Sequence, residues 1–410
     1  MVRALALLFL LAFPAAAQAR AGDLDPSFAG GAAALLQRAG ANLSGSAVAV
    51  QGDGRATVVG SDGRGFLVAR FTAHGRLDRS FGRGGSMTIG FGGVAGGARA
   101  AALFRDGRIL VAGTVTVGGV RRFAVARLQP GGHLDENFGD GGAVVVGPAG
   151  AHLEAMALQP EGELVLAGSV PAGPRRAVLV MRLLADGSPD PAFGRGGVVD
   201  STAVKLAGRA RAVALRPDGR ILLAVSAEAG RASRATFIAA MLTPGGVFDP
   251  AFGGDGIARI ATTSRRLRGG GAAALVLGRG GGLILAGTAR GAGGRDDATV
   301  VRVRPDGSRG SVNRLVDPHR RSLQIASMRR DARGRLVLGG RASRLGAAVL
   351  RLRASGRRDR SFGQGGLMPG RLPRTRPAAL ALLRDGDIVL TGRARIGRRD
   401  RLVVARLQGR

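Results

Sequence analysis

The sequence lacks cysteine, tryptophan and tyrosine, and each absence excludes a kind of protein or site. Without cysteine there is no disulfide framework and no lipoprotein anchor. Without tyrosine a sialidase-type site has no nucleophile. A quinoprotein-type site would lack the tryptophan and cysteine on which it relies.

Histidine is also scarce. The four histidines are spaced unlike any pair of metal ligands, and each is expected to be a solvated loop residue: His74, His133, His152 and His319. We therefore expect no metal site and no cofactor.

Beyond its first residues the sequence has no apolar run long enough to cross a bilayer. Arg3 precedes the short apolar run Ala4–Phe13, and Ala17-Gln18-Ala19 supplies small residues suited to cleavage. This pattern predicts a signal peptide over residues 1–19, with a buried N-terminal helix as the alternative. We expect residues 20–410 to form a single secreted, periplasmic or envelope domain with no membrane span.

Positive charge is in large excess. Lysine and arginine total 61 against 28 aspartates and glutamates, for a formal net charge of +33, and Lys205 is the only lysine. Such a charge attracts polyanions. The alternative is that the arginine, alanine and glycine bias of a high-GC bacterial genome accounts for part of the excess.

The chain repeats itself seven times. The first repeated marker is a pair of apolar runs around a turn, as in AALFRDGRILVAG, with copies that begin at Ala47, Ala101, Met156, Val213, Ala274, Ser327 and Leu380. Asp-Gly between two apolar runs is a strong hairpin signal, since a type I′ turn needs positive φ at both central residues. Each copy therefore predicts two antiparallel strands.

A second marker follows each first one, as an apolar strand with an arginine near its end, such as FAVARL at Phe123. Six of the seven copies carry the arginine, and Met241 replaces it in the other; the six are Arg70, Arg127, Arg182, Arg302, Arg351 and Arg406.

A third marker is rich in Asp, Phe and Gly, as in LDENFGDGG at Leu134. Its phenylalanines recur every 53 to 59 residues, apart from one step of 110 where the copy near Ser308–Pro318 has decayed; they are Phe28, Phe81, Phe138, Phe193, Phe252 and Phe362. A short outer strand follows each copy.

Residues that recur in every repeat usually serve the repeat itself. We expect the phenylalanines to wedge between units, each contributing roughly 1.5–3 kcal/mol through burial. The alternative, an aromatic platform for sugars or bases, would favour the missing tryptophan and tyrosine. We expect the second-marker arginine to pair with the Asp eight residues later, such as Arg127 with Asp135.

Four strands per unit, without helical periodicity, predict an all-β fold: a seven-bladed β-propeller of four-stranded antiparallel blades. The last unit lacks an outer strand, and a spare strand near Gly31–Leu36 precedes the first unit. We expect this N-terminal strand to close the last blade and remove its exposed edge.

The three markers in this order, DG-[RKE]-ILVAG, [FL]-x-V-A-R-[LF] and LDxxFGxGG, resemble those of the delta-60 repeat family of bacterial exported proteins. The resemblance covers nearly all of residues 20–410 and implies a propeller of the NHL type. It implies no established catalytic activity and supplies no active-site residues. The departures are Met241, Gly280-Gly281 in place of Asp-Gly, and the lost sixth phenylalanine.

Charge is unevenly placed along each unit. The first and third turns of a blade share one face of a propeller and here carry aspartates, whereas the second turns and the links between blades share the other face and carry arginines. We predict that this second face is the more basic one. Its candidate anion-binding residues are Arg121, Arg122, Arg175, Arg176, Arg265, Arg266, Arg268, Arg320, Arg321, Arg398 and Arg399.

These features favour a monomeric, non-catalytic binding or scaffold module. The partners that fit are an anionic envelope polymer, anionic lipid head groups or an acidic protein. Nucleic acid is not favoured, because base-stacking side chains are few. The alternative is a lactonase-like hydrolase or lyase with carboxylates in the central channel. The first strands, which should line that channel, are nearly all Ala, Leu and Val and weigh against it.

Overall fold

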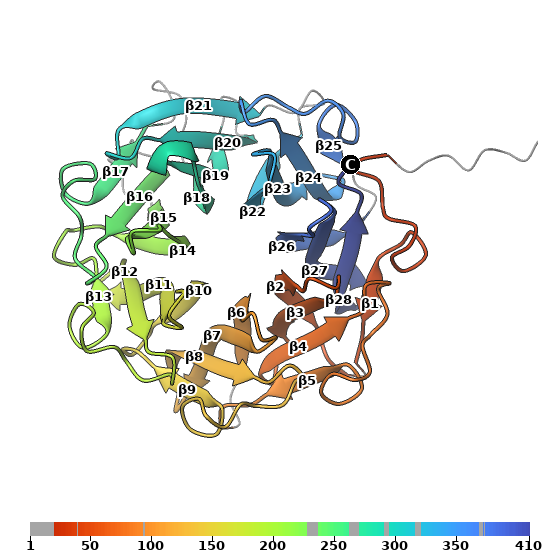
Figure 1. Ribbon diagram of the computed structural model, residues 1–410, viewed down its shortest axis with the longest axis horizontal. Coiled ribbons are helices and arrows are strands. Elements are labelled where there is room, and N and C mark those ends of the chain that lie inside the picture. The colour runs from red at the N-terminus through yellow and green to blue at the C-terminus, as the bar shows by residue number, and fades with distance from the viewer. Residues whose placement is uncertain are drawn as a thin grey trace, which may run out of the picture.

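A computed structural model describes residues 20–38, 40–92, 95–227, 237–261, 270–290, 295–315, 321–368, 372 and 374–410. It contains seven four-stranded antiparallel sheets, which are arranged radially around a common axis (Figure 1). The predicted all-β, seven-bladed propeller is confirmed.

Each blade has four strands that run from the axis outwards, and we number the blades 1 to 7 from β2 onwards. The innermost strands are β2 (Ser44–Val50), β6 (Gly96–Leu103), β10 (His152–Leu158), β14 (Gly208–Leu215), β18 (Gly270–Leu277), β22 (Leu323–Arg330) and β26 (Thr375–Leu382). The second strands are β3 (Ala56–Ser61), β7 (Ile109–Val117), β11 (Leu164–Ala172), β15 (Ile221–Ala227), β19 (Leu283–Arg290), β23 (Leu336–Ala342) and β27 (Ile388–Ile396).

The third strands are β4 (Phe66–Phe71), β8 (Val120–Leu128), β12 (Arg175–Leu183), β16 (Phe237–Leu242), β20 (Asp296–Val303), β24 (Gly346–Leu352) and β28 (Arg399–Leu407). The outer strands are β5 (Ser86–Ile89), β9 (Ala143–Val146), β13 (Val198–Asp200), β17 (Ile257–Ile260), β21 (Arg309–Leu315), β25 (Leu367–Met368) and β1 (Ala34–Leu36). One short 3-10 turn, η1 (Arg279–Gly281), connects β18 to β19. Among the described residues, no helix is long and apolar enough to span a membrane.

The N-terminal strand closes the ring, as the sequence predicted. β1 pairs antiparallel with β28, and Ala34 lies opposite Val404. Residues ahead of β1 also form backbone hydrogen bonds with the end of β28 and the residue after it. Gly22 N–H donates to Gln408 O at 2.7 Å, and Asp25 N–H donates to Arg406 O at 2.9 Å. Blade 7 is therefore built from both ends of the chain, and its outer edge is paired.

Because neighbouring strands are antiparallel, the connections alternate between two faces. We call the face with the first and third turns of each blade the marker face. The face with the second turns and the links from each outer strand to the next innermost strand is the link face. The link face thus carries the predicted basic loops.

The hydrophobic core lies between blades. One of its clusters, for example, joins Leu110 of blade 2 and Leu166 of blade 3 around Phe138. The ring of Phe138 packs beneath Gly187 of blade 3, where φ is +93° and a Cβ would lie 2.9 Å from the ring. The marker phenylalanine is a wedge between blades, and the facing glycine leaves room for it.

The second-marker arginine makes contacts on both sides of the same boundary. Arg127 is buried, and its Nε donates to Asp135 Oδ2 at 2.6 Å within blade 2. Its Nη1 donates to the carbonyl oxygen of Ala185 in blade 3 at 2.6 Å. The guanidinium lies 5.0 Å from the centroid of Phe138. One side chain therefore joins its own turn, the next blade and the wedge.

The same arrangement recurs at four other boundaries. Arg70, Arg182, Arg351 and Arg406 each pair with an aspartate, donate to a carbonyl of the following blade and lie over a marker phenylalanine. The aspartates are Asp78, Asp190, Asp359 and Asp25 respectively. The pair between Arg406 and Asp25 again joins the two ends of the chain.

Blade 4 keeps the aspartate and changes the arginine. Met241 occupies the arginine position, and Arg220 Nε binds Asp249 Oδ2 at 2.7 Å instead. Arg220 follows the glycine of the first turn. The equivalent residue of blade 2, Arg108, lies 3.7 Å from Asp135 and is that aspartate's second partner. In blade 4 this arginine is therefore the main partner of the aspartate.

Replacing Arg127 by Met should destabilise the protein by about 2–3 kcal/mol, because a buried Asp135 loses its main cation. Methionine fits the position sterically, since blade 4 carries Met241 there. The measurement is thermal unfolding followed by circular dichroism. Arg121→Met, on an exposed turn, is the matched control and should leave the melting temperature unchanged. Equal melting temperatures for the two variants would mean that the buried pair contributes nothing to stability.

Asp135 should make stability depend on pH. Burial alone would raise the pKa of this carboxyl, but the hydrogen bond and charge of Arg127, together with the Asn137 N–H and Arg108, lower it overall. Its contribution is thus complete above the unfolded pKa of about 3.9 and is lost as pH falls through the lower folded pKa. Asp135→Asn should cost stability at pH 7 and less below about pH 4. Denaturant unfolding at both pH values measures this, and a difference that stays constant with pH would contradict it.

Candidate functional site

Every innermost strand contains a β-bulge at the same place, near the link face. The register shifts between Ala98 and Ala100 in β6 and between Leu153 and Ala155 in β10, and likewise in the other five. Each bulge leaves one residue unpaired: Ser46, Arg99, Glu154, Arg211, Ala273, Ala326 and Ala378. Bulges re-aim side chains, and all seven residues line one cavity of about 450 Å³ on the propeller axis. We call this cavity the channel mouth.

In the ring of bulge residues, the charged side chains come from three neighbouring blades. Blades 2, 3 and 4 contribute Arg99, Glu154 and Arg211 to the ring of bulge residues, and the other four blades contribute serine or alanine. Arg211 Nη1 binds Glu154 Oε1 at 2.7 Å. Arg341 and Arg376 also line the cavity. Its lining thus has four arginines and a single carboxylate.

This composition corrects the expectation that channel-facing residues are nearly all Ala, Leu and Val. The bulge adds a residue that strict strand alternation does not anticipate, and that residue faces the axis. The available signal was the charged residue at one shared position in GARAAAL, HLEAMAL and GRARAVAL. Sequence reasoning missed Arg99 and Glu154.

His152 departs from the solvated loop position expected of it. It is the first residue of β10 and partly buried, with Nδ1 3.1 Å from Thr114 Oγ1 and Nε2 3.8 Å from Glu154 Oε1. Burial lowers the pKa of His152, and Arg99, Arg176 and Arg209 lower it further, against the opposing charge of Glu154. The imidazole is therefore neutral at neutral pH. His74 and His133 lie in exposed turns as expected, and His319 lies outside the described residues.

Among the described residues, no group of three or more His, Asp or Glu side chains is placed to hold a metal ion.

The predicted basic residues that are described lie on the link face. Arg121 and Arg122 are at the β7–β8 turn, Arg175 and Arg176 at the β11–β12 turn, Arg398 and Arg399 at the β27–β28 turn, and Arg321 precedes β22. Arg122 donates to Gly147 O at 2.6 Å, and Arg176 to Ser169 Oγ at 2.9 Å. Arg265, Arg266, Arg268 and Arg320 lie outside the described residues.

Carboxylates are few on the link face and mostly engaged. Within the described ranges they are Asp62, Glu154, Asp200, Asp296, Asp297 and Asp400. Four of these six form ion pairs with Arg38, Arg211, Arg314 and the Arg393–Arg395 strand end. Across the part of the chain that the structure describes, Arg121, Arg175, Arg398 and Arg399 are exposed and have no carboxylate within 4.0 Å. These exposed arginines contribute uncompensated positive charge to the face.

Comparisons with known proteins agree on the architecture. Residues 105–138 and 159–193 match a family described as a β-propeller domain of unknown function, DUF5122. The chain is a β-propeller similar to that family over these segments. No curated protein matches it.

Among solved structures, selenomethionine-substituted virginiamycin B lyase from Staphylococcus aureus is similar with a TM-score of 0.52 and 11% identity, over 90% of this chain and 98% of that chain. Sqt1 from Chaetomium thermophilum has a TM-score of 0.46 and 12% identity, over 90% and 96%. At these identities the likeness to the lyase shows the fold alone.

The pKa of His152 can be tested directly. Glu154→Gln removes the one charge that raises it, so the pKa of His152, already below its ordinary value, should fall further. Histidine NMR titration measures this, with the signals of His74 and His133 as internal references. A pKa of His152 that rises or stays constant in Glu154→Gln would show that the two side chains are not adjacent in solution.

Proposed function

We propose that the protein is an exported, non-catalytic β-propeller that binds an anionic polymer of the cell envelope through its link face. The observation that carries this proposal is the set of exposed, uncompensated arginines on that face, at Arg121, Arg175, Arg398 and Arg399. They lie on the same face as the channel mouth, whose lining includes four arginines and one carboxylate. Export is supported by the signal-like pattern of residues 1–19 and by the resemblance to exported repeat proteins.

A polymer suits this face better than a single small anion. The arginine pairs stand on separate blades, at the second turns of blades 2, 3 and 7, so an extended chain of negative groups can contact several at once. Arginine forms bidentate hydrogen bonds with phosphate and carboxylate. A rigid ring holds these contacts at fixed spacing, and linked contacts raise the overall affinity above that of any one.

The test compares two variants with the same charge change. The link-face variant carries Arg121→Ser, Arg122→Ser, Arg175→Ser and Arg176→Ser; the marker-face control carries Arg76→Ser, Arg79→Ser, Arg105→Ser and Arg357→Ser. Binding to polyphosphate and to polyglutamate is measured over a range of salt concentrations. We expect the link-face variant to bind at least about tenfold more weakly. Its affinity should also depend less steeply on salt concentration, because fewer arginine contacts release fewer counterions on binding.

The control should bind within about twofold of the parent, because its arginines lie on the opposite face. An equal loss in both variants would show that binding follows total charge and would overturn the link-face proposal. Unfolding curves of both variants establish that each is folded.

A hydrolase or lyase acting at the channel mouth is the second candidate, favoured by the proximity of His152 and Glu154 there. Its difficulty is that the carboxylate of Glu154 is already held by Arg211, whose Nη1 lies 2.7 Å from Glu154 Oε1. The likeness in fold to a lyase does not carry that protein's activity over. Turnover of a lactone panel that disappears in His152→Gln would establish this candidate and overturn the non-catalytic one.

A further inference from the structure

The boundary between blades 5 and 6 lacks two of the repeated contacts, because the third turn of blade 5 is shorter than that of blade 2. In blade 2, Ala126 pairs with Ala143 across the third turn, 17 positions along the chain. In blade 5, Val301 pairs with Val312, only 11 positions along. The six missing residues are those that carry the aspartate and phenylalanine in the other blades. The structure thereby locates the decayed marker copy.

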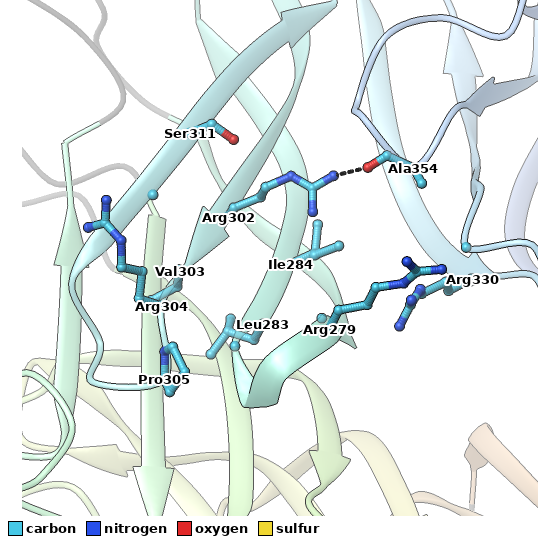
Figure 2. Close-up of a pocket in the computed structure, with 14 residues that line it drawn as sticks. Arg279, Leu283, Ile284, Arg302, Val303, Arg304, Pro305, Ser311, Arg330 and Ala354 are labelled. Atoms are coloured by element: carbon cyan, nitrogen blue, oxygen red, sulfur yellow. Dashed lines mark hydrogen bonds between the residues drawn. The ribbon is translucent and has the colours of Figure 1, made fainter.

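Arg302 is left without its usual partners. Its Nη2 still donates to Ala354 O in blade 6, at 2.5 Å (Figure 2). No aspartate or phenylalanine among the described residues accompanies it, and Asn313 lies against Gly356, the glycine that faces the wedge at other boundaries. Among the described residues, no carboxylate lies within ion-pair distance of Arg302. A repeated structural arginine has here become an unneutralised one.

A cavity of about 440 Å³ occupies the place of the lost contacts on the marker face. Arg279, Arg302, Arg304 and Arg330 line it together with the aliphatic side chains of Leu283, Ile284 and Val303, and its lining contains no carboxylate. Its volume is that of a site for a small molecule. It differs from the channel mouth in both face and lining.

Arg330 is a second change at the same boundary. It ends β22 opposite Leu336, the first residue of the second strand. The equivalent position is aliphatic in all six other blades: Val50, Leu103, Leu158, Leu215, Leu277 and Leu382. A cation therefore replaces an aliphatic residue beside the only blade that lacks the marker.

Two of the guanidinium groups converge. Nη2 of Arg330 and Nη2 of Arg279 both lie within 4 Å of the position that a Cβ on Gly334 would take, and both side chains reach the same end of the cavity in Figure 2. Nearby carboxylates are engaged elsewhere: Asp331 binds Arg335 at 2.6 Å, and Asp306 accepts from Ser308 N. Like charges held this close repel each other unless an anion lies between them.

We propose that this cavity, which we call the blade 5–6 pocket, binds a small phosphate ester. Arg279, Arg302 and Arg330 hold the phosphoryl group, and Leu283, Ile284 and Val303 contact the organic part. Arginine matches phosphate oxygens through bidentate hydrogen bonds, and a mixed aliphatic and cationic lining fits an ester better than a bare ion. The pocket is independent of the proposed polymer site, because it opens on the opposite face.

The key variant is Arg330→Leu, which restores the residue type of the other blades. It should fold at least as well as the parent and lose the pocket's affinity. The probes are glycerol phosphate and inorganic phosphate at millimolar concentration, with sodium chloride at equal ionic strength as the blank. Binding is measured by calorimetry and by the rise in melting temperature. Arg105→Leu, on an exposed turn of the same face, is the matched control.

We expect glycerol phosphate to bind the parent and Arg105→Leu equally, and Arg330→Leu at least about tenfold more weakly. Inserting DENFGD between Arg309 and Gly310 restores the marker, fills the pocket and should also remove binding. Tighter binding of the ester than of inorganic phosphate supports the assignment of the ligand class. Equal affinity of Arg330→Leu and the parent, or no binding of either probe to the parent, overturns the proposal.

Discussion

The ring depends on a guanidinium that recurs at five of its seven blade boundaries. Arg127 and its counterparts bind an aspartate in their own blade, a carbonyl oxygen in the next blade and the face of the phenylalanine between them. Blades touch only their neighbours, so the closed fold requires each boundary to be satisfied separately. Two boundaries deviate, and both border blade 5. At one, Met241 is offset by Arg220, and at the other Arg302 has no replacement partner.

The repeat also divides the arginines into those that have a repeated carboxylate partner and those that do not. Apart from Arg302, the repeated arginines are neutralised by the marker aspartates on the marker face, which holds most of the described carboxylates. Arginines of the second turns and links have no repeated partner. Among the described residues, the link face with its six carboxylates is thus the more basic of the two faces. At the channel mouth, the bulge position occurs once in each of the seven blades. It carries a charged side chain in only three of them, at Arg99, Glu154 and Arg211.

Much of the fold could be predicted from sequence, because its signals are local and occur seven times. The Asp-Gly turns define the hairpins, and the spare segment ahead of the first unit, which contains β1, supplies the strand that blade 7 lacks. The site residues were harder to predict. Glu154 faces the axis because of a bulge in β10. That bulge is visible only in the pairing register of β10 with β11. Loss of the sixth phenylalanine was evident in the sequence. The role of Arg330 was not, because only the pairing register shows that it occupies the strand position held by Leu103 and Leu158 in other blades.

Closure of blade 7 has a consequence for how the chain acquires its structure. Arg406 and Asp25 are separated by 381 positions, so their contact is among the most non-local that a chain of this length can form. Blades 1 to 6 are assembled from contiguous segments and can form as synthesis proceeds, whereas the seventh waits for the final strand. Non-local pairing of this kind slows folding and prolongs the exposure of unpaired edges. Until β28 arrives, β1 is a strand without a neighbour, and the nascent chain is most vulnerable to aggregation at its first and last blades.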